Sequence, residues 1–133
     1  MWTAEKRLRI AFAAGAVTDA LALVPMLSPT MAELVWGSPQ DLFGSALARG
    51  YAASLMSGWT LLLLWAFQRP IERRLIAPLT ALVIVGLALA QALAVAVGVI
   101  SFARMLPTWI LQAALISLFV GAYVSARAPT SRN

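Results

Sequence analysis

The feature that most constrains this chain is a set of four uninterrupted apolar runs. They extend from about Ile10 to Leu27, Ser45 to Phe67, Leu79 to Phe102 and Thr108 to Ala126, and each holds about 18–24 residues. A helix needs roughly 20 residues to cross about 30 Å of hydrocarbon. The runs do not alternate polar and apolar residues, and a membrane β-barrel needs at least about eight strands. We therefore predict an all-α integral membrane protein with four transmembrane helices.

The composition agrees with a lipid environment. Of the 133 residues, 62% are hydrophobic and 11% are charged, whereas a soluble domain is about half apolar and about a quarter charged. The length favours a single membrane domain, residues 1–133. The chain has no cysteine and no histidine. Their absence excludes disulfides, thiol redox chemistry and histidine-ligated haem, and it removes the usual general base near neutral pH.

The connections between the runs suggest how the helices follow one another. Only the first connection is long, and Ser28-Pro29 at its start is typical of a helix N-terminus. We expect a short interfacial helix there, over about 29–36 in the first outer loop. The other connections are short, so neighbouring helices should be antiparallel and form an up-down-up-down bundle. Pro25 removes one helical hydrogen bond, so we expect a kink or an early helix end at that position.

The first run also has features of a secretory signal peptide. A basic stretch precedes it, and the tripeptide Ala20-Leu21-Ala22 loosely fits a cleavage site. However, Asp19 interrupts the apolar stretch, and the run continues to Leu27. We therefore expect the segment to be retained as a membrane helix.

The basic residues are distributed very unevenly between the two sides of the predicted bundle. With the N-terminus inside, two arginines are outside, Arg49 and Arg104. The eight inside are Lys6, Arg7, Arg9, Arg69, Arg73, Arg74, Arg127 and Arg132. Basic residues favour the cytoplasmic side of short loops. The split predicts a multi-pass protein of the cytoplasmic (inner) membrane, of bacterial type, with both termini in the cytoplasm.

A cytoplasmic basic cluster follows the second run. It consists of Arg69, Arg73 and Arg74, with Glu72 among them. We interpret it as a topology anchor with an internal ion pair, and a docking site for a partner is the alternative. The net charge of +5 is carried at the ends of apolar runs. We therefore expect membrane lipids, and no nucleic acid, to be the partners of these charges.

Small residues four apart form a row on each predicted helix. Helices in lipid associate through close backbone approach, which such rows allow. The alternative is that an alanine-rich chain produces rows by chance. The expected packing residues are Gly15, Gly58, Gly86, Ala90, Ala94, Gly98 and Gly121.

Each predicted helix also has a polar residue near the middle of the bilayer. These residues are Asp19, Ser57, Gln91 and Ser117, and Asp19 is the one acidic residue inside a span. An ionised carboxylate at that depth is costly, so such residues usually face the bundle interior and often mark a pathway or relay. One hypothesis is therefore a polar, proton-coupled site around Asp19. The other is a protonated Asp19 that only hydrogen-bonds Gln91 or a serine, which contributes about 0.6–2 kcal/mol.

Four helices with one acidic residue in the first resemble small multidrug-resistance transporters in architecture. Those proteins use a glutamate in the first helix and have a weak charge bias. This chain has Asp19 in Val17-Thr18-Asp19-Ala20, and its charge bias is strong. The resemblance is therefore limited to architecture, and we do not assign the chain to that family. The strong charge bias also argues against an antiparallel dimer.

The sequence contains no metal-ligand spacing, no nucleophile–base arrangement and no glycine-rich phosphate loop. We therefore expect no catalytic residues, metal or cofactor, and a non-enzymatic role. An accessory, structural or interaction subunit is the first expectation, within a larger membrane complex. The alternatives are a small proton-coupled transporter or channel centred on Asp19, working as a homo-oligomer, and a lipid- or isoprenoid-binding protein that uses a groove near Pro25.

Overall fold

A computed structural model describes residues 2–36 and 46–127 of the chain. Five helices occur in these ranges and no strand does. In chain order they are α1 (Ala4–Leu27), α2 (Pro29–Trp36), α4 (Ala46–Gln68), α5 (Ile76–Ala96) and α6 (Phe102–Arg127). The helices α1, α5 and α6, together with Ala48–Gln68 of α4, are long and apolar enough to cross a membrane. The chain is thus all-helical in these ranges with four candidate spans, as predicted.

Local sequence signals explain where α1 and α2 begin. The Thr3 side chain accepts a hydrogen bond from the backbone N–H of Lys6 at 3.3 Å, which caps α1. Ser28 separates the two helices, and Pro29 is the first residue of α2, where its missing N–H is harmless. The helix α1 continues through Pro25 to Leu27, so Pro25 does not end it early. The short helix expected over 29–36 is present.

A glycine ends α5 earlier than the apolar run suggests. Gly98 has φ of +78°, in the left-handed region that favours glycine. The N–H of Gly98 donates to the carbonyl of Val95 at 3.0 Å, and that of Val99 donates to the carbonyl of Ala94 at 2.9 Å. This double closure is a Schellman motif. The expected span 79–102 therefore ends as a helix at Ala96.

The last helix begins earlier than expected, at Phe102 rather than near Thr108. Pro107 therefore lies inside α6, where it leaves the carbonyl of Ala103 without its usual helical donor. The second span was expected from about Ser45, which lies outside the described residues. Within the described residues, α4 extends from Ala46 to Gln68.

Gly98→Ala should lower the free energy of unfolding by about 1–2 kcal/mol, because an L-residue is strained in the left-handed region. A Cβ at this position would meet nothing within 4 Å, so the loss isolates backbone strain. Denaturant unfolding in detergent, followed by circular dichroism, measures it. Gly86→Ala is the control, since Gly86 also has open space but lies inside a helix. Equal stability of the two variants would contradict the assigned role of Gly98.

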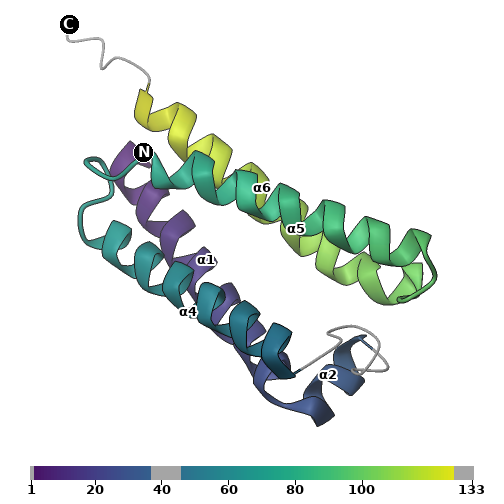
Figure 1. Ribbon diagram of the computed structural model, residues 1–133. Coiled ribbons are helices and arrows are strands. Elements are labelled where there is room, and N and C mark those ends of the chain that lie inside the picture. The colour runs from purple at the N-terminus through teal and green to yellow at the C-terminus, as the bar shows by residue number, and fades with distance from the viewer. Residues whose placement is uncertain (1, 37–45, 128–133) are drawn as a thin grey trace, which may run out of the picture.

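The four long helices form two antiparallel pairs (Figure 1). Helix α1 packs against α4, and α5 packs against α6, while contacts between α1 and α6 join the pairs. The pairs lie close together where the N-terminus is labelled and diverge toward α2 (Figure 1). The helices alternate in direction, as expected for an up-down-up-down bundle (Figure 1). The first and last helices, α1 and α6, are in contact, whereas α4 and α5 do not pack along their lengths.

The buried core lies where the two pairs meet. It is formed by the start of α1, the end of α4, the start of α5 and the end of α6. Phe12 and Phe119 are fully buried at its centre, with ring centroids 6.2 Å apart. Arg7 donates to the hydroxyl of Ser125 at 2.8 Å, which also joins α1 to α6. These contacts join the pairs at this end, and at the opposite end α2 contacts α6.

Most of the basic residues also lie at the end that contains the buried core. We call it the basic end, where α1 and α5 begin and α4 and α6 end. Its basic residues in the described ranges are Lys6, Arg7, Arg9, Arg69, Arg73, Arg74 and Arg127. Arg49 and Arg104 lie in the first turns of α4 and α6, at the opposite end, which we call the open end. Arg132 lies outside the described residues.

The small-residue rows do not form the helix contacts that were expected. Gly15 is the exception: it packs against α6, since a Cβ at this position would lie 2.7 Å from Cζ of Phe119. By contrast, Gly58, Gly86 and Gly121 are exposed, and a Cβ at each would meet nothing within 4 Å. Ala90 is also exposed and Ala94 is half-buried. The face that α5 buries includes Ile76, Thr80 and Ile84 instead, which is a different side of the helix.

Candidate functional site

Asp19 lies one helical turn beyond the packed part of α1. Residues four apart share a helix face, so Asp19 follows Ala11 and Gly15 on the same side. Ala11 and Gly15 are buried in the core, whereas Asp19 is half-buried. It lies about 12 Å from the end of α1 at Leu27, at 1.5 Å per residue. The carboxylate therefore sits where the two helix pairs begin to separate.

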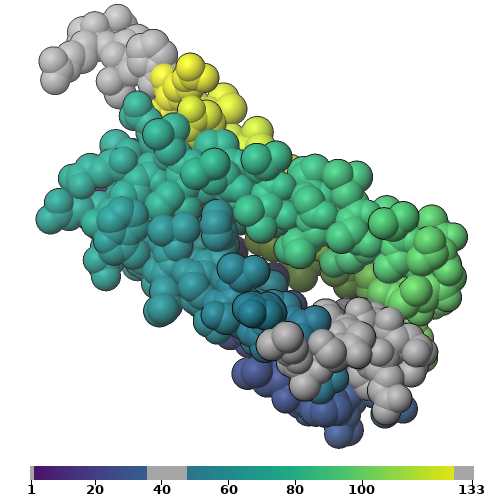
Figure 2. Space-filling model, viewed as in Figure 1, coloured from purple at the N-terminus to yellow at the C-terminus, as the bar shows by residue number. Residues whose placement is uncertain are grey.

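A crevice of about 390 Å³ opens at this position. We call it the Asp19 crevice. Its lining residues are Asp19 and Met26 of α1, Ala52, Leu55, Met56 and Trp59 of α4, and Thr80, Val83, Ile84 and Leu87 of α5. Figure 2 shows the surface hollowed between α4 and α5. Three helices thus enclose a space whose walls are mostly aliphatic and aromatic.

The Asp19 carboxylate has no partner in the part of the chain that the structure describes. No hydrogen bond or ion pair reaches it from residues 2–36 or 46–127. Two other residues with polar groups, Thr80 and Trp59, line the crevice. The Thr80 hydroxyl donates to the carbonyl of Ile76 at 2.8 Å, and the Trp59 indole N–H is buried without an acceptor. A carboxylate without a partner is unusual between apolar walls, and a buried indole N–H without an acceptor is unusual as well, because both groups lose hydrogen bonds to water.

The other three residues of the expected polar site do not line this crevice. The hydroxyl of Ser57 donates to the carbonyl of Ala53 on its own helix. Ser117 is exposed and lines a different hollow, beside Arg7 of α1. The side-chain oxygen of Gln91 is buried without a partner. Within the described residues, Asp19 forms no hydrogen bond with Gln91 or a serine. The polar residues that line the crevice with Asp19 are Trp59 and Thr80.

Sequence reasoning missed Trp59 and Thr80, although helical periodicity carried a signal for both. Trp59 precedes the fully buried Leu63 by one turn, and Thr80 follows the buried Ile76 by one turn. Each therefore lies on the buried face of its helix. The signal could be used only once those buried faces were known, because α4 and α5 are apolar on nearly every side.

The three arginines of the basic cluster have three different environments. Arg69 pairs with Glu72 at 3.4 Å, and both side chains are exposed. Arg73 lies over the Trp65 ring, 3.5 Å from its centroid, and donates to the Trp65 carbonyl. Arg74 lines a hollow at the basic end. The internal ion pair expected for this cluster is thus formed, by Arg69 and Glu72.

In the described ranges, no three histidine, cysteine, aspartate or glutamate residues come close enough to hold a metal ion. Comparisons of the chain with protein-family models, curated proteins and solved structures find no match.

Proposed function

We propose that this chain is a membrane protein whose Asp19 crevice binds a lipophilic organic cation. The observation that carries the proposal is the unpartnered carboxylate of Asp19 in a crevice with almost entirely apolar walls. A cation with an apolar body satisfies both parts of such a site. Trp59 supports the same ligand class, because the face of an indole ring attracts cations.

The apolar surroundings of the crevice also suggest that binding of a cation is coupled to release of a proton from Asp19. An uncompensated carboxylate inside a membrane costs about 2.5–3.5 kcal/mol at the helix centre. No lysine or arginine lines the crevice, so no basic group in its walls offsets that cost. A carboxylate in this setting holds either a proton or a cation, and an arriving cation would therefore displace a proton. This exchange is the chemistry that a proton-coupled transporter needs.

Tetraphenylphosphonium and tetraphenylborate provide a direct test, because the two ions have closely similar shapes and opposite charges. The purified protein in nanodiscs should bind the phosphonium saturably and leave the borate at the level of empty nanodiscs. Equilibrium dialysis measures both. Equal binding of the two ions would show that the apolar walls act alone, and the proposal would fail.

We also propose that the basic end faces the cytoplasm, since seven basic residues of the described ranges lie there against two at the open end. The chain has no cysteine, so a single introduced cysteine reports its own location. A membrane-impermeant maleimide should label Thr30→Cys in intact cells and Gln68→Cys only after permeabilisation. Both positions are exposed. Labelling of Gln68→Cys alone in intact cells would reverse the assigned orientation.

The role as an accessory or interaction subunit is the second candidate. The divergence of α4 and α5 favours it, because a helix of another protein could lie between them against Leu55, Val83 and Leu87, whose side chains are exposed. A larger complex or a homo-oligomer would provide that helix. Mass measurement of the protein extracted in mild detergent separates the candidates. A stable assembly that excludes tetraphenylphosphonium favours the subunit, and a lone chain that binds it favours the binding protein.

A further inference from the structure

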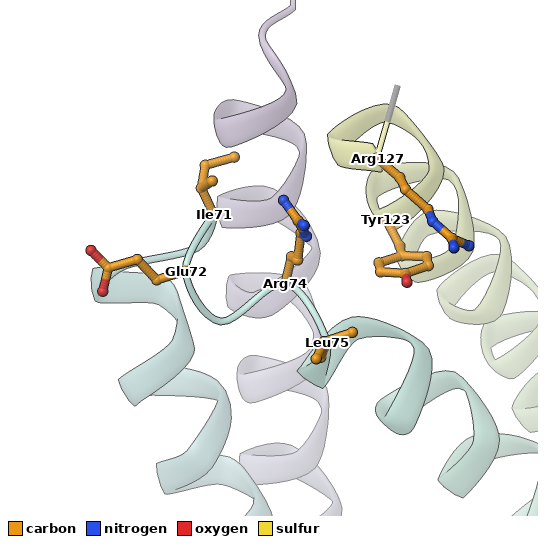
Figure 3. Close-up of a pocket in the computed structure, with 6 residues that line it drawn as sticks. All are labelled: Ile71, Glu72, Arg74, Leu75, Tyr123 and Arg127. Atoms are coloured by element: carbon orange, nitrogen blue, oxygen red, sulfur yellow. The ribbon is translucent and has the colours of Figure 1, made fainter. Parts of the chain in front are cut away.

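A second hollow lies at the basic end, between the α4–α5 connection and the last turns of α6 (Figure 3). Its volume is about 490 Å³. Its lining residues are Ile71, Glu72, Arg74, Leu75, Tyr123 and Arg127. We call it the arginine hollow. It shares no lining residue with the Asp19 crevice, so the two sites are separate.

The two arginines of this hollow have no partner among the described residues. No carboxylate, hydroxyl or carbonyl there accepts a hydrogen bond from the guanidinium of Arg74 or Arg127. Glu72 is the one acidic residue in the lining, and its carboxylate pairs with Arg69 outside the hollow. In Figure 3, Glu72 is directed away from Arg74. The hollow therefore offers two unpaired positive charges.

These charges come from segments that are far apart in the sequence. Arg74 belongs to the α4–α5 connection, and it stands across from Tyr123 and Arg127 on α6 (Figure 3). Leu75 is 62% exposed and Ile71 is 41% exposed, so apolar surface lies beside the charges. Because α5 begins at Ile76 and α6 ends at Arg127, the hollow is level with the ends of two spans, where lipid headgroups lie.

We propose that the arginine hollow binds the phosphate of an anionic lipid headgroup. A guanidinium group donates two parallel hydrogen bonds to phosphate oxygens, which makes arginine well suited to this group. The Tyr123 hydroxyl is a further donor beside the arginines. Leu75, at the start of α5, would contact the apolar part of the same lipid (Figure 3). Basic pockets between membrane helices bind phosphorylated headgroups in this way.

The experiment uses the full chain in detergent and three probes: phosphatidylglycerol, phosphatidylcholine and inorganic phosphate. Thermal unfolding is followed as each probe is titrated. We expect phosphatidylglycerol to raise the unfolding temperature with saturation, while the other two produce no saturable shift. A saturable shift with inorganic phosphate alone, lost in Arg74→Gln, would identify a site for a soluble phosphate and overturn the lipid as its source.

Matched arginine variants show where on the basic end the lipid binds. Arg74→Gln and Arg127→Gln should each weaken phosphatidylglycerol binding about fivefold, since a basic residue near an anionic lipid contributes about 1 kcal/mol. Arg73→Gln removes the same charge from the α4–α5 connection, but Arg73 lies over the Trp65 ring and does not line the hollow, and its variant should bind within about twofold of the wild type. An equal loss in all three variants would show diffuse attraction by the whole basic end and refute the site.

The two proposals can fail independently. Arg74→Gln leaves the Asp19 crevice untouched, so its tetraphenylphosphonium binding should equal that of the wild type. A variant that loses both ligands and melts at a lower temperature without any ligand is misfolded. In that case Arg74→Lys, which keeps the charge, should restore folding and bind phosphatidylglycerol more weakly than the wild type because it lacks the fork of two donors. Full binding by Arg74→Lys would contradict recognition through the guanidinium fork.

Discussion

Replacing Asp19 with asparagine should weaken tetraphenylphosphonium binding at least about tenfold, the largest effect expected of any single substitution in this chain. Asparagine keeps the size of the side chain and removes only its charge. Loss of one member of a desolvated charge pair costs about 2–5 kcal/mol, and about 1.4 kcal/mol corresponds to a factor of ten. Equilibrium dialysis with the protein in nanodiscs measures the affinity.

Two control variants make the result specific to the carboxylate. Asp19→Glu keeps the charge and should retain measurable binding. Ser57→Ala removes a hydroxyl that donates only to its own helix, so it should bind as the wild type does. The proposal is refuted by an Asp19→Asn protein that binds the cation with unchanged affinity.

Gly15→Ala should cause the largest loss of stability expected from adding a single methyl group. The new Cβ would lie 2.7 Å from Cζ of Phe119 and 3.0 Å from Cδ1 of Leu63. Both neighbours are completely buried, so neither can move into free space. Overpacking of this kind costs about 1–3 kcal/mol. Unfolding in detergent should show this decrease, and Gly15→Leu should prevent accumulation of the folded protein.

Gly58→Ala is the matched control, because Gly58 lies in α4 with nothing within 4 Å of its added Cβ. Its stability should equal or slightly exceed that of the wild type, since alanine is the better helix former. A second substitution tests the contact itself. Phe119→Leu makes room beside residue 15, so Gly15→Ala should cost less in that background. Equal costs in both backgrounds would show that Phe119 does not set the space at Gly15.

The number and type of the helices could be predicted from the sequence because length and hydropathy alone determine them. The runs around Leu21, Leu62, Val85 and Val120 each correspond to a helix. Helix ends were less predictable, because they depend on single residues. Gly98 looked like one member of a row of small residues, yet it ends α5 through its left-handed conformation.

The packing faces could not be predicted, since alanine and glycine occur on several sides of every helix. Of the expected glycine contacts within the chain, the structure shows the one at Gly15. Asp19 was identifiable because a single carboxylate in an apolar run is rare. Its neighbours in the crevice were not, because Trp59 and Thr80 lie on other helices, and which of their faces turn toward α1 depends on how the helices pack. That divergence follows from a core confined to the basic end, which no local pattern encodes.

Fluorescence quenching at Trp59 tests most directly whether a cation occupies the Asp19 crevice. A variant keeping Trp59 as its one tryptophan would be titrated with a bromophenyl-substituted tetraphenylphosphonium, whose heavy atom quenches on contact. A variant keeping only Trp109, which lies against Phe102 at the open end, corrects for cation dissolved in the lipid. We predict saturable quenching of Trp59 that disappears with Asp19→Asn, and no saturable quenching of Trp109. Equal quenching of the two tryptophans, or quenching of Trp59 that survives Asp19→Asn, would contradict a cation site at Asp19.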